Sequence, residues 1–358
     1  MKFHKGIIAG VIFLISACNT PGPDYRSLLD QLEADSLRQI AERTGIEFSV
    51  NEDQVINQMK ARIGMFTEEE KRLWEKLNWL EYRVINGEKR YFSRAVTNLD
   101  RIRSFHFERA ARDSAESRDP EMVERKKHTQ AIIRESSVRN EPVLPEDIQI
   151  TYTLTVQPDA VPAGETVRCW LPYPKENHPR QTDVKFISAS QEDFQISPDS
   201  AMHRTIYMEA IALKGKPVIF RISFSYRSSG HYFNPANINT EPYNNNSALY
   251  KKYTSKQAPH IRFTEEVMHI ADSIAGSEET PFETVRKIYH WFSNNIPWAG
   301  APEYSIIPDI PDYVLTNRRG DCGMQTLLLM SMLRYKGIPV RWQSGWKIPP
   351  GYKNLNDW

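Results

Sequence analysis

Cys322 stands in a sequence context that suits a nucleophile. The motif Gly320-Asp321-Cys322-Gly323 directly precedes a long apolar run, so we expect the cysteine to open a buried helix. At a helix start, the unpaired backbone N–H groups and the positive end of the helix dipole favour thiolate over thiol. A thiolate attacks acyl carbon atoms, which is the first step of covalent catalysis on amides. The alternative is a cysteine that only fills space in the core.

The segment after Cys322 predicts the buried helix. Its apolar positions are Met324, Leu327, Leu328, Leu329, Met330, Met332 and Leu333. They cover nearly every side of the helix rather than one stripe, which indicates burial. Gly337 is expected to end this helix, and a strand is predicted over Val340 to Trp346.

Composition sets the class of protein. The chain has 358 residues, 40% hydrophobic and 25% charged, with 46 basic against 45 acidic residues and a net charge of +1. This predicts a soluble globular protein with two or three domains, and no basic excess points to nucleic acid. Neither a metal-ligand cluster nor a phosphate loop appears, so no cofactor is expected.

The first eighteen residues predict a targeting signal. Lys2 and Lys5 precede an apolar stretch that is too short to span a membrane, and Ile15-Ser16-Ala17-Cys18 ends it. The pattern resembles a bacterial lipoprotein signal with its lipobox. The resemblance implies cleavage before Cys18, lipidation of that cysteine and export to the cell envelope, with the outer membrane as the expected anchoring surface. A plain secretory peptide is the alternative.

Hydrophobic periodicity divides the rest of the chain into a multidomain arrangement. Helical spacing over 24–137 predicts a helical region, in which Thr67 to Glu70 form a capping box for a helix that ends at Asn86-Gly87. Alternation over 142–230 predicts an antiparallel β-sandwich whose Cys169 faces the core. Residues 231–257 are expected to be a linker, and a third region opens near residue 258.

The third region carries a family resemblance. Caps at Thr264 and Thr280 open two helices, Asn294-Asn295-Ile296-Pro297-Trp298 ends the second, and a loop leads to the cysteine motif. With "RRGDCGMQTLLLMSMLRYKGIPVRW", residues 258–358 resemble the transglutaminase-like superfamily, an α+β fold similar to papain-like cysteine proteases. The resemblance implies that Cys322 is the nucleophile. The preceding helical region and sandwich are similar to the layout of secreted transglutaminase-like proteins of Bacteroidetes-type bacteria.

The resemblance does not extend to the family's catalytic histidine and aspartate. Its histidine follows the strand after the nucleophile helix, and Asn356 stands in that register; its aspartate lies one strand later, past Trp358. An asparagine cannot shuttle a proton at neutral pH. His260, His269 and His290 are expected to be ordinary residues on or before the preceding helices. We therefore expect a core that is incomplete at its C-terminal end, with impaired catalysis.

Two functions remain open at this level. The first is a lipid-anchored transglutaminase-like cysteine peptidase or amidase, a hydrolase-type protein whose partner would be a peptide or protein substrate. The second is a non-catalytic surface lipoprotein that binds a polymer or protein partner, with a vestigial cysteine domain. Three tryptophans either line a peptide cleft or pack in the core, and core packing is the more frequent role of such residues. They are Trp298, Trp342 and Trp346.

An activated Cys322 predicts selective labelling. Iodoacetamide at neutral pH is expected to modify Cys322 in preference to Cys169, as measured by peptide mass spectrometry. Equal and slow labelling of both cysteines would contradict the enzyme hypothesis.

Overall fold

The computed structural model describes residues 25–107, 120–235, 238, 240–276 and 280–345. The chain forms two compact units, each assembled from separate stretches. The first combines residues up to His106 with Lys256–Ala275 and Lys287–Tyr335. The second combines Phe107–Ser255, Gly276–Arg286 and residues from Lys336 onward. The domain boundaries read from periodicity stay a prediction.

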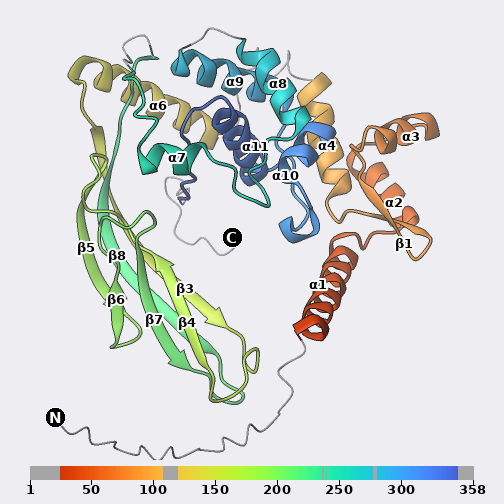
Figure 1. Cartoon of the computed structure of the whole chain (residues 1–358), viewed down its shortest axis with the longest axis horizontal. Coiled ribbons are helices and arrows are strands. Elements are labelled where there is room, and N and C mark those ends of the chain that lie inside the picture. The colour runs from red at the N-terminus through yellow and green to blue at the C-terminus, as the bar shows by residue number, and fades with distance from the viewer. Residues whose placement is uncertain (1–24, 108–119, 236–237, 239, 277–279, 346–358) are drawn as a thin grey trace, which may run out of the picture. The chain divides into compact units, whose positions relative to one another are not determined.

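The N-terminal segment, residues 25–106, lies in the first unit and is mainly helical (Figure 1). Side chains of Asn51 and Thr67 cap its second and third helices in capping boxes, of which the one at Thr67 was predicted. The elements are α1 (Tyr25–Glu47), α2 (Glu52–Arg62), α3 (Glu68–Lys76), β1 (Tyr82–Ile85), β2 (Glu88–Tyr91) and α4 (Ala95–Phe107).

The helix predicted from the capping box at Thr67 to Asn86-Gly87 is wrong in its second half. Helix α3 ends at Lys76, and Asn86-Gly87 is the turn of an antiparallel hairpin that pairs Tyr82 with Tyr91. Both turn residues have positive φ, 52° and 81°, as a tight two-residue hairpin requires. The same Asn-Gly pair is compatible with a helix end, which explains the error.

Two three-stranded antiparallel sheets form in the second unit, as the alternation predicts. One has the order β3-β8-β5, and the other β4-β7-β6 (Figure 1). Their facing side chains make a core that contains Cys169, Phe220 and Phe224. Burial raises the pKa of the Cys169 thiol. The strands are β3 (Val143–Val156), β4 (Thr166–Pro172), β5 (Gln181–Ala189), β6 (Phe194–Ile196), β7 (Thr205–Ile211) and β8 (Val218–Gly230).

Helices flank the strands in sequence. In the second unit α6 (Pro120–Arg139) precedes β3, and α7 (Ala248–Thr254) lies within the stretch predicted as a linker. Ser247 caps α7 by accepting the N–H of Tyr250.

The later elements follow their caps. Thr264 and Thr280 accept the N–H groups of Val267 and Glu283 at 3.3 and 3.2 Å, as predicted. A loop was expected before the cysteine motif, yet a 3₁₀ turn and a helix capped by Asp309 occupy part of it. These elements are α8 (Glu265–Ala275), α9 (Pro281–Asn295), η2 (Tyr304–Ile306), α10 (Ile310–Asn317) and α11 (Cys322–Tyr335).

The strand predicted over Val340 to Trp346 does not form within its described part, residues 340–345. Val340 donates its N–H to the carbonyl of Tyr253, at the end of α7, over 3.0 Å. A strand needs a ladder of such bonds to a neighbouring strand, and an α-helix end offers only one. Trp346 lies outside the described residues.

None of the helices in the described ranges is long and apolar enough to cross a bilayer. The predicted signal, with its lipidation site Cys18, lies outside those ranges.

The sandwich core predicts a large effect of Phe220→Ala. Phe220 is fully buried on β8, so we expect the free energy of unfolding to fall by about 3–5 kcal/mol in urea denaturation. Ile219→Ala is the control, because Ile219 is 42% exposed on the opposite face and its replacement should cost less than about 0.5 kcal/mol. Equal costs at the two positions would contradict the strand register.

Candidate functional site

Cys322 is the first residue of α11 and its side chain is exposed. The Asp321 carboxylate caps this helix by accepting the N–H of Met324 at 2.9 Å, and the Asp321 carbonyl accepts the N–H of Gln325 at 3.0 Å. The predicted helix start is therefore correct. A thiol that is both exposed and at a helix N-terminus satisfies two conditions for reactivity.

Backbone donors lie beside the thiol. Within the described part of the chain, no hydrogen bond takes up the N–H groups of Cys322 or Gly323, whereas Asp321 occupies the next two. Such free first-turn N–H groups bind anions. They suit the oxyanion that forms when a thiolate adds to a carbonyl group.

The segment that follows α9 is paired with the turn that carries the cysteine. We call Arg318–Asp321 the cysteine turn. Gly320 donates its N–H to the Pro297 carbonyl at 3.3 Å and accepts the N–H of Ala299 at 3.1 Å. Gln325, one helical turn after Cys322, donates its side-chain amide to the Gly320 carbonyl at 3.0 Å. These bonds explain why the "NNIPW" exit accompanies the cysteine motif: the two segments form one structure.

Tyr304, from η2, reaches the start of α11. Its hydroxyl donates to the Asp321 carboxylate. Burial in the first place, and then this hydrogen bond, raise the pKa of Tyr304, so its hydroxyl stays protonated. The close approach requires glycine at position 323, because a Cβ atom there would collide with the Tyr304 hydroxyl.

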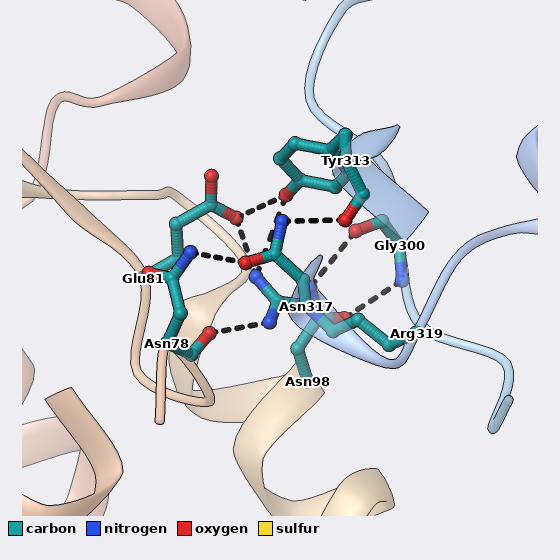
Figure 2. A network of polar contacts seen from close by, with 7 residues as sticks. All are labelled: Asn78, Glu81, Asn98, Gly300, Tyr313, Asn317 and Arg319. Carbon is teal, nitrogen blue, oxygen red and sulfur yellow. Dashed lines mark hydrogen bonds and ion pairs between the residues drawn. The ribbon is translucent and has the colours of Figure 1, made fainter. Parts of the chain in front are cut away.

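The cysteine turn is also held from the N-terminal segment. Arg319 is only 2% exposed, and its guanidinium donates to the Glu81 carboxylate at 2.6 Å and to the Asn78 carbonyl (Figure 2). Tyr313 donates its hydroxyl to the same carboxylate at 2.6 Å. Burial is the main reason that the pKa of Tyr313 is raised, which keeps this hydroxyl a donor.

Other contacts join the same two stretches of chain. The Asn98 side chain donates to the Gly300 carbonyl at 2.8 Å and accepts the Gly300 N–H at 2.7 Å, both in the interior (Figure 2). The Arg101 guanidinium lies 4.3 Å from the ring centre of Trp298. Trp298 is 46% exposed, so it is not a core residue and it borders the cysteine turn.

The other predicted residues do not gather around Cys322. His269 and His290 are exposed on α8 and α9, and the Nδ1 atom of His260 is buried without a hydrogen-bond partner. Across the described ranges, no hydrogen bond joins a histidine to Cys322, and no group of three or more His, Cys, Asp or Glu is placed to hold a metal ion. Asn356 lies outside those ranges, while Trp342 is half-buried in the second unit.

Arg319, Glu81, Tyr304 and Asn98 were not singled out from the sequence. Only Arg319 had a local signal, since it lies inside the cysteine motif. Glu81 and Asn98 are brought to the site by contacts that span 238 and 202 positions, and no spacing rule connects residues so far apart. Tyr304 lies 17 positions before its partner Asp321, within the segment predicted as a loop.

Comparison with known proteins gives one family. Residues 268–356, which include Cys322, match the model described as the transglutaminase-like superfamily. A solved structure from Cytophaga hutchinsonii, provisionally described as a cysteine protease, is 15% identical over 55% of this chain and 67% of that chain, with a TM-score of 0.39. Among curated proteins the comparison finds no match.

The contact between Tyr304 and Gly323 predicts that Gly323→Ala is destabilising. Alanine normally stabilises a helix relative to glycine by about 1 kcal/mol, but the collision should reverse the sign and cost about 1–3 kcal/mol in urea unfolding. Adding Tyr304→Phe removes the colliding oxygen and should recover part of the loss. Gly45→Ala, in α1 with open space around it, is the matched control and should be neutral or stabilising. A stabilised Gly323→Ala variant would contradict this geometry.

Proposed function

We propose that this chain, in which residues 268–356 form a transglutaminase-like domain, is a cysteine-dependent protein that acts on peptide or side-chain amides. The observation that supports it most strongly is the placement of Cys322. The thiol is exposed at the first position of α11, next to two backbone N–H groups that suit an oxyanion. A cysteine that only filled space would be buried, as Cys169 is.

The proposed chemistry is acyl transfer through a thioester. The Cys322 sulfur bonds to the carbonyl carbon, and the carbonyl oxygen becomes an anion that the N–H groups of Cys322 and Gly323 stabilise. The C–N bond then breaks, and the amine leaves with a proton. Water or a second amine attacks the thioester and releases the thiol. The amine departs only when a proton donor reaches it, so this step depends most on an acid–base partner.

We further propose that turnover of amides is impaired in this chain. Asn356 stands in the register in which the family carries its histidine, and an amide side chain cannot take up and return a proton at neutral pH. The thiol could then still attack a carbonyl carbon, but an amine, which is a poor leaving group without a proton, would not be expelled. Activated esters would acylate Cys322, whereas amides would react slowly.

The alternative function is binding without catalysis, with a vestigial cysteine domain. An exposed aromatic side chain in the sandwich favours it: Trp170 on β4 is 58% exposed, and its ring centre lies 5.0 Å from that of the half-buried Tyr207 on β7. An exposed tryptophan supported by a neighbouring ring is suited to contact with a polymer or a protein partner.

We also propose that the protein is exported and anchored to the cell envelope, the outer membrane in particular, by lipid on Cys18. The supporting observation is the order of charge, apolar run and small residues before that cysteine. A peptide or protein of the envelope would then be the substrate.

Reaction with p-nitrophenyl acetate tests the nucleophile apart from its acid–base partners, because nitrophenolate leaves without a proton. We expect a burst of nitrophenolate close to one equivalent and an acetyl group on Cys322, located by peptide mass spectrometry. Cys322→Ala should abolish the burst and Cys169→Ala should keep it. The matching p-nitroanilide should give little or no turnover.

The burst must also be compared with a plain thiol. Burial alone protects Cys169, so selective labelling of Cys322 over Cys169 does not establish activation. The discriminating quantity is the alkylation rate of Cys322 in the folded protein relative to the urea-unfolded chain, expected to be about tenfold higher at neutral pH. An alkylation rate of Cys322 equal to that in the unfolded chain would contradict the proposed function.

A further inference from the structure

Arg319 lies three residues before Cys322 and is one of the most deeply buried charged groups in the described part of the protein, at 2% exposure. Removing a guanidinium from water is costly unless anions and acceptors replace the water. Here they do: Glu81 lies 2.6 Å away, the Asn78 carbonyl accepts a second N–H group, and the Tyr313 hydroxyl accepts a third contact at 3.4 Å. The guanidinium is therefore fixed in position and in orientation.

The partners of Arg319 are themselves fixed. Glu81 is 5% exposed and also accepts the Tyr313 hydroxyl, while the Asn78 side chain donates to Asn317, which in turn donates to the Tyr313 carbonyl at 2.8 Å (Figure 2). Each member has at least one further partner in the network. Such a closed set of buried polar groups favours one arrangement over its neighbours.

This network acts on the backbone that presents the nucleophile. Arg318 has a left-handed backbone conformation, with φ of 49°, and Gly320 is paired on its other side with Pro297 and Ala299. Arg319 lies between Arg318 and Gly320, whose backbones are both constrained. A displacement of the Arg319 side chain therefore shifts the backbone of the whole cysteine turn. Asp321, which caps α11, follows at once.

Stability alone is a poor reason for such a group, because well-packed apolar residues often replace a buried ion pair without loss. A planar fork that must satisfy several acceptors at once does something that apolar residues cannot: it defines an angle as well as a distance. In this protein, the guanidinium of Arg319 defines the position and orientation of the turn before Cys322.

We propose that Arg319 is a positioning residue for Cys322, and that Glu81 and the N-terminal segment which supplies it are part of the active unit. The proposal rests on the function proposed above. Other contacts point the same way: Arg83 donates to the Ile306 carbonyl at 3.3 Å, and Asn98 holds Gly300. The N-terminal segment thus contacts the chain at several places along the path from Trp298 to the cysteine turn.

The test separates positioning from stability with a triple variant, Glu81→Met, Tyr313→Phe and Arg319→Met. It replaces the polar network by apolar groups, so the thermal midpoint should stay within about 5 °C of the parent protein. Alkylation of Cys322 in the folded protein should nevertheless become about tenfold slower. Amide hydrogen exchange over residues 318–325 should become faster, while exchange over residues 328–335 stays unchanged.

Two further variants keep the test interpretable if the triple variant does not fold. Arg319→Lys keeps the charge and loses the fork, and it should slow alkylation and speed exchange over residues 318–325. Lys71→Met is the matched control, since Lys71 is a buried cation whose partners Glu52 and Glu75 lie in the N-terminal segment. It should lower the thermal midpoint and leave the alkylation rate of the folded protein unchanged.

The outcomes are distinct. Parent-like alkylation and exchange in Arg319→Lys or in a folded triple variant would overturn the positioning role. Slower alkylation in Lys71→Met as well would assign the effect to general stability and overturn it too. If Cys322 of the parent protein reacts no faster than in the unfolded chain, the proposed function fails; the exchange data over residues 318–325 then decide the positioning role by themselves.

Discussion

A guanidinium group without water around it must have its acceptors supplied by the protein, and Arg319 receives most of them from a distant part of the chain. Glu81, its anionic partner, lies 238 residues earlier in the sequence. Forming this pair closes a very long loop, so the contact cannot hold unless the surrounding apolar packing has already brought the two stretches together. The N-terminal segment and the cysteine turn are for this reason parts of one compact unit rather than separate modules.

Around Cys322, buried groups hold the backbone in place and the exposed thiol is left accessible. At the start of α11, Met324 and Leu328 are fully buried, whereas Cys322 is exposed. The cysteine turn is held by Arg319 on one side and by the backbone of Pro297 and Ala299 on the other. A nucleophile gains from such rigidity, because its sulfur must lie within bonding range of a carbonyl carbon without reorganising the backbone.

Within the described residues, the hydroxyl groups that contact the cysteine turn and its partners hold carboxylates in place rather than exchange protons. Tyr304 and Tyr313 both have a raised pKa and act as permanent donors, so neither exchanges protons with a thiol near neutral pH. Their role is to keep carboxylates of Asp321 and Glu81 in place. A site built in this way is well suited to hold a thiol and an oxyanion, and it leaves the departure of an amine to another group.

The sequence by itself determined what depends on neighbours along the chain. The caps at Thr67, Thr264 and Thr280, the alternating strands and the start of α11 at Cys322 were all predicted, because each is decided within a few residues. The cysteine motif also indicated the family resemblance. Sequence signals that are compatible with two structures gave a wrong prediction. Asn86-Gly87 can end a helix or form the turn of a hairpin, and only the pairing of β1 with β2 distinguishes the two. The tertiary structure alone decided that Arg319 is buried against Glu81, because burial and pairing depend on which surfaces meet.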